Sequence, residues 1–374
     1  MFLPLFRYHN FTFSFLFFFL LLFLPNCLPA RILSESSSSL TELTVDDRIE
    51  NSINNTWRKF MKFLDAEKGS HVSGMSELKK YFQRFGYLAD VSGNNFTDLF
   101  DEELESALLA YQKNLGLPAT GKLDSGTMKQ ITSPRCGVGD GDTITHKLHA
   151  KIHYAYFYGE PRWIRVPPMT LTYAFSSENL IDYISLPEIK SAFERSFARW
   201  SSVIPVNFTE AEDYSLADIK IGFYRGDHGD GEAFDGVLGV LAHAFSPENG
   251  RFHLDSAETW AVDFKTQRSK VAVDLESVAT HEIGHILGLA HSSVKEAVMY
   301  PSLSPRTKKV DLKIDDVAGI QALYGSNPNF KLSSLYESDL SSSRSILMES
   351  RRLSKWTSLV LLWWFLFFLC GYDL

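Results

Sequence analysis

One run of eleven residues constrains this chain more than any other feature: HEIGHILGLAH, which begins at His281. A helix over about 274–289 is predicted to carry it. His281 and His285 are four residues apart, so a helix places both on one face, about one turn apart. Gly288 tolerates backbone angles that other residues avoid, and it lets the chain turn so that His291 returns to the same side. The run therefore predicts three imidazoles that converge on one point.

Three converging imidazoles are the protein ligands of a catalytic zinc, which keeps its fourth position for water. Zinc lowers the pKa of that water from ~15.7 toward ~7. Glu282 follows the first histidine, where its carboxylate can take a proton from the water and pass it to a leaving amine. HExxH strings also occur by chance on charged helix faces, but the longer run fixes five positions. Met299 follows His291 by eight residues, in VMYP, which completes the extended metzincin pattern.

The length and composition allow two domains with tails. The chain has 374 residues, 22% of them charged, and its net charge of −8 offers no footprint for nucleic acid. Three apolar stripes at helical spacing predict a small all-α domain over about 50–135, and core packing explains each stripe. An α+β domain of about 170 residues follows. Its predicted strands lie at 169–175, 206–208, 219–223 and 237–245, and its helices at 189–200, 274–289 and 314–324, with 141–165 as a linker.

Both ends of the chain are apolar. The run Phe15–Leu24 indicates a secretory signal peptide over residues 1–30. A membrane anchor is the alternative, but ten apolar residues fall short of the ~20 that span a bilayer. The run Leu359–Cys370, behind a Ser-rich stalk at 327–343 and a polar spacer, is typical of a GPI-attachment signal over 344–374. A transmembrane tail anchor is the alternative there. These signals predict a secreted protein on the outer face of the plasma membrane or in the extracellular matrix. The protein is expected to be a monomer.

The cysteines and the glycosylation sequons also bear on secretion. Of three cysteines, Cys27 would leave with the signal peptide and Cys370 with the tail, so that only Cys136 remains. Secreted proteins normally pair their thiols, so a lone one needs an explanation. Three glycosylation sequons fit passage through the secretory pathway: Asn54, Asn95 and Asn207.

From about residue 50 to 326 the chain resembles the matrixins, or matrix metalloproteinases, and in particular the plant members, which lack a hemopexin-like domain. The motifs that carry the resemblance are PRCGVGD, PRW, LTYAF, GDHGDGEAFDG, LAHAF, HEIGHILGLAHS, VMYP and DDVAGIQALYG. The helical domain resembles the matrixin propeptide, itself similar to peptidoglycan-binding modules. The resemblance implies a metzincin-like zinc protease domain, a twisted mixed sheet plus three helices, at 154–326. It also implies a propeptide at 31–153, removed to leave a mature N-terminus near Tyr154.

The resemblance gives Cys136 a role in the segment 134–140. In the family, the propeptide cysteine binds the catalytic zinc and displaces its water, which keeps the zymogen latent. A thiolate is a good zinc ligand, so the chemistry agrees. A buried free thiol is the alternative. Arg135 and Asp140 are present for the salt bridge that the family implies. Gly139 stands where the family usually has proline, a departure that is expected to loosen the loop and ease activation.

Two more metal sites are implied, giving two zinc ions per chain and calcium. The spacing of three histidines and an aspartate matches the structural zinc site of matrixins: His228, Asp230, His243 and His253. Three carboxylates and three backbone carbonyls fit a calcium site, with a solvated acidic loop as the alternative: Asp235, Asp255 and Glu258, with Gly236, Leu238 and Val240. Asp218 is a candidate for a second calcium, although the loop that completes that site is shorter here.

The family's substrates, extracellular proteins and peptides, lie extended beside a strand, here Leu241–Ala244, and pair with its main chain. Leu241 and Ala242 are therefore expected to contact substrate. The pocket for the residue after the scissile bond lies between the catalytic helix and the segment after Met299, with Pro301 in its wall. Ser277 is small and is expected to leave this pocket deep, suited to a bulky apolar side chain.

Two other readings are a non-enzymatic adhesion or peptidoglycan-binding protein with a dead protease fold, and an astacin- or reprolysin-like enzyme. Intact Glu282 and Cys136 argue against the first, because a dead enzyme needs no inhibitory cysteine. The second type relies on disulfides, for which this chain has no cysteines to spare.

Overall fold

The computed structural model describes four stretches of the chain: residues 57–89, 96–140, 143–144 and 153–333. All of them belong to one compact unit, Thr44–Leu374. The predicted signal peptide, the GPI signal, most of the stalk, Asn54 and Asn95 lie outside the described residues. Within the described stretches, no helix is both long and apolar enough to cross a membrane.

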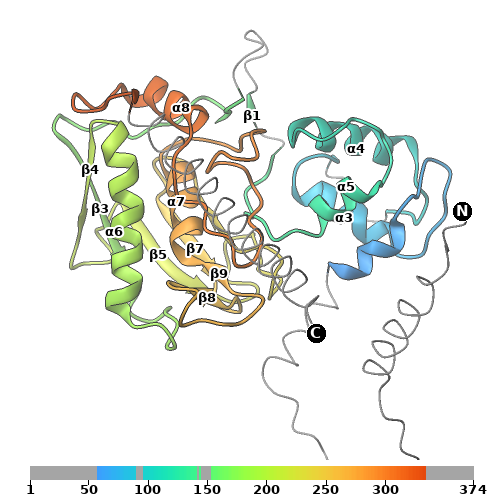
Figure 1. Ribbon diagram of the computed structural model, residues 1–374, viewed down its shortest axis with the longest axis horizontal. Helices are drawn as coiled ribbons and strands as arrows, with labels where there is room; N and C mark the ends of the chain where they lie inside the picture. The colour runs from blue at the N-terminus through green and yellow to red at the C-terminus, as the bar shows by residue number, and fades with distance from the viewer. Residues whose placement is uncertain (1–56, 90–95, 141–142, 145–152, 334–374) are drawn as a thin grey trace, which may run out of the picture. The chain divides into compact units, whose positions relative to one another are not determined.

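The first domain is helical, as its apolar stripes predicted (Figure 1). Asp101 and Asp124 begin two of its helices by accepting hydrogen bonds from backbone N–H groups of the first turn. Phe63, Phe82 and Tyr111 are fully buried in its core. The stripe near residue 60 forms a 3₁₀ helix, and the short last helix was not predicted. The helices among its described residues are η1 Arg58–Phe63, α3 Met75–Arg84, α4 Glu102–Asn114 and α5 Ser125–Ile131.

The second domain is built on a five-stranded mixed sheet with the order β4-β3-β5-β7-β6. Four strands are parallel, and only β6 runs antiparallel to its neighbour, with His243 opposite His253. The predicted mixed sheet is confirmed. Its strands are β3 Met169–Phe175, β4 Val206–Glu210, β5 Ile219–Tyr224, β6 Ala242–Ala244 and β7 Arg251–Asp255. Two short pairs accompany it: β1 Thr143–Ile144 with β2 Tyr156–Phe157, and β8 Trp260–Ala261 with β9 Val273–Asp274.

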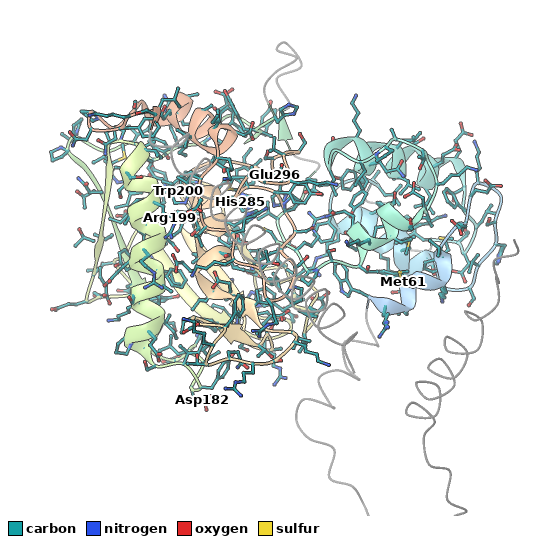
Figure 2. The ribbon with its side chains drawn as sticks, in the orientation of Figure 1. Met61, Asp182, Arg199, Trp200, His285 and Glu296 are labelled. Carbon is teal, nitrogen blue, oxygen red and sulfur yellow. The ribbon has the colours of Figure 1, made fainter. Side chains whose placement is uncertain are left out.

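Three helices complete this domain, also as predicted: α6 Leu186–Val203, α7 Leu275–Ile286 and α8 Ile314–Tyr324. Ser185 and Glu188 form a capping box at the start of α6. Trp200 on α6 is fully buried, and its indole N–H donates to the carbonyl of Thr280 on α7 at 2.9 Å (Figure 2). This contact holds the helix that carries His285 against α6.

Two expectations need correction. The strand expected over 237–245 is confined to Ala242–Ala244, because Leu238 has a φ of 59° and its N–H donates to Glu258 instead of to a strand. The expected linker is also too long at its carboxyl end. From His153 on the chain packs on the domain, and Trp163 is 2% exposed with its indole N–H donating to the carbonyl of Ile286.

Candidate active site

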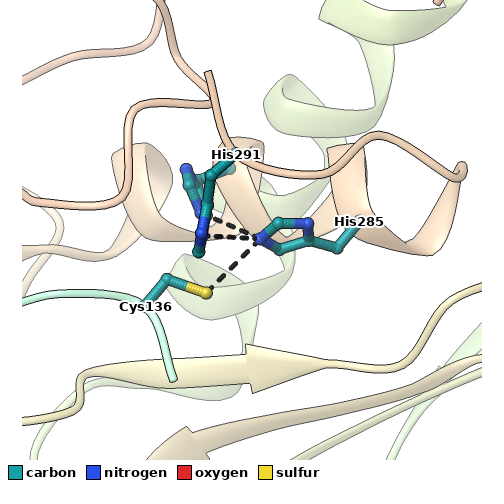
Figure 3. Close-up of side chains that lie close together, drawn as sticks. Cys136, His285 and His291 are labelled. Carbon is teal, nitrogen blue, oxygen red and sulfur yellow. Dashed lines mark hydrogen bonds between the residues drawn. The ribbon is translucent and has the colours of Figure 1, made fainter. Parts of the chain in front are cut away.

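The three histidines of the opening run meet as their spacing predicts. His281 and His285 lie on α7, and Gly288 ends the helix with a φ of 108°. A Cβ at Gly288 would lie 2.2 Å from the carbonyl oxygen of Pro161, so no other residue fits that turn. Nε2 of His285 is 3.1 Å from Nε2 of His281 and 3.2 Å from Nε2 of His291 (Figure 3).

The other ring nitrogens determine how these imidazoles are oriented. Nδ1 of His281 donates to the carbonyl of Val298, and Nδ1 of His285 to that of Leu289, both at 2.7 Å. Nδ1 of His291 donates to Oδ1 of Asp140 at 2.6 Å. Each Nδ1 therefore carries the proton, and each Nε2 presents a lone pair to the same point. Burial, and then the neighbouring rings, lower the pKa of His281 and His285, which keeps them neutral.

Cys136 completes this cluster. Its Sγ lies 3.4 Å from Nε2 of His285 (Figure 3). The four ligand atoms lie within 4.8 Å of one another, and all four residues are buried. Lone pairs that converge with no proton between them repel, and a cation among them removes the repulsion. Three imidazoles and one thiol are also a donor set that zinc prefers, so the residues present fit that ion.

The carboxyl group of Glu282, next to this cluster in the sequence, lacks hydrogen-bond partners among the described residues. Its side chain is 1% exposed, and neither carboxylate oxygen accepts a hydrogen bond of normal geometry from the described residues. Burial raises the pKa of Glu282 to about 8, and the nearby Cys136 thiol opposes that rise. A buried carboxyl group without a partner is costly, and such groups concentrate at functional sites.

The methionine turn lies directly beneath the helix. A Cβ at Gly284 would be 2.3 Å from Sδ of Met299, so the glycine between the two histidines makes room for that sulfur. Asp316 on α8 holds the turn, because its carboxylate accepts from the N–H groups of Val298 and Met299 at 2.9 and 3.0 Å. This role of Asp316 was not predicted from the sequence, although the residue lies in the DDVAGIQALYG motif.

The segment around Cys136 pairs with the main chain on both sides. Arg135 N donates to the carbonyl of Gly239, and Gly137 N to that of Ala242. Cys136 N donates to the carbonyl of Pro301 at 2.8 Å. Ala242 and Pro301 are residues that were expected from the sequence to contact substrate. A Cβ at Gly137 would lie 2.6 Å from the Val240 side chain, so this close approach requires glycine.

The predicted salt bridge between Arg135 and Asp140 is present at 2.8 Å, and both side chains are buried. The guanidinium also lies 3.6 Å from the centre of the Phe85 ring. Burial raises the pKa of Asp140, but Arg135 and His291 lower it further, so that it stays below its usual range. Asp140 thereby links the Cys136 segment to a histidine of the cluster, which the sequence did not reveal. Gly139 needs no left-handed backbone, and a Cβ there would meet nothing closer than 4.0 Å.

A second cluster lies beside the sheet. Oδ2 of Asp230 is within 2.8 to 2.9 Å of one ring nitrogen from each of three histidines. These ring nitrogens are also 3.0 to 3.3 Å from one another in two of the pairs. Burial lowers the pKa of His243 and of His253 to about 4, so both rings are neutral at pH 7. This donor set fits a closed structural zinc site, and its members are His228, Asp230, His243 and His253.

Three carboxylates gather next to it. Asp255 and Glu258 are 0% and 2% exposed, and one oxygen of Glu258 has no partner among the described residues. Burial, and to a smaller extent the neighbouring Asp235, raises the pKa of Asp255 to about 6, against the hydrogen bonds from two backbone N–H groups. The N–H groups of Gly236, Leu238 and Val240 donate to these carboxylates.

The predicted second calcium ligand has other partners. Both oxygens of Asp218 accept hydrogen bonds, one from Arg165 and the other from Thr172. The second calcium site stays a prediction that these contacts do not favour. Asn207 is exposed on β4, at the edge of the sheet, where a glycan has room.

A helix with two histidines, a third histidine after a glycine turn and a methionine beneath define a zinc-dependent peptidase. Comparison with known families agrees. Residues 162–325 match the family described as "Matrixin", and residues 72–131 match the "Putative peptidoglycan binding domain".

Curated relatives narrow the class further. Metalloendoproteinase 1-MMP of Arabidopsis thaliana is 56% identical over 320 residues, which cover 84% of this chain and 86% of the relative. Metalloendoproteinase 4-MMP of the same plant is 61% identical over 266 residues, 71% of this chain and 76% of the relative. Metalloendoproteinase 1 of Glycine max is 46% identical over 272 residues, 71% and 87% of the two chains. The chain belongs to the matrixin family and is a zinc metalloendopeptidase of the plant type.

Proposed function

We propose that this chain is the latent, secreted precursor of an endopeptidase that cleaves extracellular proteins, and that Cys136 keeps it inactive. The observation that carries the proposal is the position of the Cys136 sulfur, which lies 3.4 Å from Nε2 of His285 within a group of three imidazoles. A catalytic zinc has three protein ligands and one open position. In this arrangement the thiol fills the fourth position.

Once Cys136 has left the site, Glu282 acts as the general base and then as the general acid. A zinc ion held by the three imidazoles would supply a Lewis acid that activates water and polarises a peptide carbonyl. Glu282 takes a proton from the attacking water and returns it to the leaving amine nitrogen. Neither oxygen of the Glu282 carboxylate has a hydrogen-bond partner among the described residues, so both are available for this proton exchange. The nearest main-chain partners for a bound peptide are Ala242 and Pro301, whose carbonyls now accept from the Cys136 segment.

Activation is proposed to cut the chain within 141–153 and to leave a mature N-terminus near Tyr154. The packing after that point supports this boundary. The carbonyl of Ala155 accepts from Ala290 N, and the hydroxyl of Tyr156 donates to the carbonyl of Gly319, both at 2.8 Å. Residues from 155 on are thus part of the catalytic domain and would remain with it.

The remaining metal roles are also proposals. The cluster of Asp230 with three histidines would hold a structural zinc that fastens the loop after β5 to β6 and β7. The cluster of Asp235, Asp255 and Glu258 would hold calcium. The support is the unpartnered, buried oxygen of Glu258, because a bound cation would offset the cost of that group.

The apolar segments near both ends of the sequence bear on where the protein is targeted. We infer a signal peptide at 1–30, a GPI-attachment signal at 344–374 and glycans at the three sequons, with residence on the cell surface or in the extracellular matrix. The alternative C-terminal transmembrane anchor predicts a chain that a phosphatidylinositol-specific phospholipase does not release from cells. Release by that enzyme would support the GPI signal.

The decisive test is a fluorogenic peptide assay on the secreted protein, before and after a thiol-reactive reagent. Activity should rise after the reagent, fall with a zinc chelator and appear without the reagent in Cys136→Ser. A wild type that binds zinc but cleaves no peptide, treated or untreated, would favour the alternative of a binding protein with a dead protease fold. In that case the helical domain should bind peptidoglycan or another polysaccharide in a pull-down assay.

A further inference from the structure

The pocket beside the catalytic helix has one lysine among its mainly apolar lining residues. Its space between atoms is about 320 Å³, a volume that includes open solvent, and the centre of a water molecule can reach about 20 Å³ of it. Leu241, Val278, Val298 and Leu303 give it apolar walls, and Glu282 is among its lining residues. Lys309 also lines it. Its role in substrate binding depends on how its backbone is held and on whether a carboxylate neutralises its ammonium group.

The loop that carries Lys309 is tied to the start of α7. The backbone N–H of Lys309 donates to Oγ of Ser277 at 2.7 Å, and that hydroxyl donates to Asp274 at 2.6 Å. One residue earlier in the chain, Nζ of Lys308 is 2.9 Å from the buried carboxylate of Glu276. Ser277 therefore does more than leave space. Its hydroxyl fastens Lys309 to the helix, one turn before His281.

The ammonium of Lys309 has no carboxylate partner among the described residues. Its Nζ donates to the carbonyl of Lys295 at 3.0 Å and lies 5.1 Å from the centre of the Tyr300 ring. Burial lowers the pKa of Lys309 to about 8, and the more distant Asp316 and Glu296 oppose that change only in part. A partly desolvated cation without a counter-ion gains from any acceptor that enters the pocket.

We propose that Lys309 makes this pocket a subsite for a side chain that ends in a carboxylate, so that the enzyme accepts glutamate directly after the scissile bond. The methylene groups of glutamate would lie along Val278 and Val298, and its carboxylate would accept from Nζ of Lys309. This inference rests on the proposed endopeptidase function. It extends the bulky apolar preference expected from the sequence, because leucine can fill the same walls but leaves the ammonium without a partner.

The test compares two peptides that differ only in this position, with glutamate or leucine, on the full-length protein activated with a thiol-reactive reagent. The measured quantity is the ratio of kcat/KM for the glutamate peptide to that for the leucine peptide. Lys309→Met should lower this ratio roughly tenfold or more, the net scale of one hydrogen bond to a charged group. Lys309→Arg should keep most of it. Lys265→Met removes an exposed lysine outside the pocket and should leave the ratio unchanged.

A charge-reversal variant distinguishes the loss of the lysine charge from a mere disturbance of the loop. Lys309→Glu should favour a third peptide, with lysine after the scissile bond, over the glutamate peptide, an inversion that a misfolded loop cannot produce. Equal ratios in the wild type, Lys309→Met and Lys309→Glu would overturn the inference while the proposed function stands. An activated wild type that cleaves none of the three peptides would overturn both.

Discussion

The imidazole of His291 donates its Nδ1 proton to Oδ1 of Asp140 at 2.6 Å, and the same oxygen accepts from Arg135. One carboxylate thus holds both the arginine of the propeptide segment and a histidine of the proposed zinc site. The hydroxyl of Tyr87 occupies its other oxygen at 2.8 Å. The proposed latency is therefore expected to depend on Asp140 as well as on the sulfur of Cys136.

Asp140→Ala should weaken latency. It removes the partner of Arg135, whose buried guanidinium then lacks a counter-ion, a loss that typically costs a few kcal/mol. Peptidase activity measured without any thiol reagent should rise at least roughly tenfold over the wild type. Glu103→Ala, an exposed acidic residue on α4, serves as the matched control and should stay latent. Equal latency of the two variants would show that Asp140 has no such role.

Gly139→Pro should tighten latency. Gly139 needs no left-handed backbone and has space for a side chain, so proline is expected to fit and to stiffen the loop by about 0.4–1 kcal/mol. The rate of activation by a thiol reagent should fall two- to fivefold. Gly137→Ala should act in the opposite direction, because its Cβ would meet the Val240 side chain at 2.6 Å. Faster activation of Gly139→Pro would contradict the idea that Gly139 loosens this segment.

Glu282→Gln should abolish cleavage without loss of zinc. The amide cannot take a proton from water, and removing a general base typically costs 10²- to 10⁴-fold in rate. Glutamine has nearly the same shape and replaces a buried side chain that has no hydrogen-bond partner among the described residues, so the melting temperature should change little. Zinc analysis by mass spectrometry and thermal melting on the same sample separate the two effects. Residual activity within tenfold of the wild type would exclude Glu282 as the base.

His243→Ala should remove the structural metal and leave the proposed catalytic one. Zinc content should fall from two ions per chain to one, and the melting temperature should drop, since a structural zinc contributes directly to folding. The control is His71→Ala, an exposed histidine in the helical domain. Should His243→Ala retain both ions, the cluster around Asp230 would need another explanation.

The preference for glutamate over leucine should depend on pH. Burial lowers the pKa of Lys309 to about 8, while Asp316 and Glu296 raise it. The ammonium is charged below that value and neutral above it, so the glutamate-to-leucine ratio should fall as the pH rises through about 8. The ratio cancels any titration of Glu282 that affects both peptides alike. Lys309→Arg keeps its charge throughout and should show no fall, and a wild-type ratio that stays constant from pH 6.5 to 9.5 would refute the prediction.

Elements with a strong local pattern were predicted well. The strand Met169–Phe175 and the helix Ile314–Tyr324 begin and end where alternation and helical spacing placed them. The strand Arg251–Asp255 was missed for two reasons. Its sequence, RFHLD, is short, and a buried strand lacks the alternation of apolar and polar residues that reveals a half-buried strand. The neighbouring loop around Leu238 was mistaken for strand, since its backbone serves buried carboxylates and not a sheet partner.

The sequence by itself determined the ligand set, because a helix period of 3.6 residues and one glycine turn suffice to bring His281, His285 and His291 together. Resemblance to a known family extended this to Cys136. Only the tertiary structure decided what surrounds the site. Asp140 meets His291 across 151 positions of the chain, and Lys309 meets Ser277 across 32. Local periodicity carries no information about such pairs, which depend on how distant segments pack.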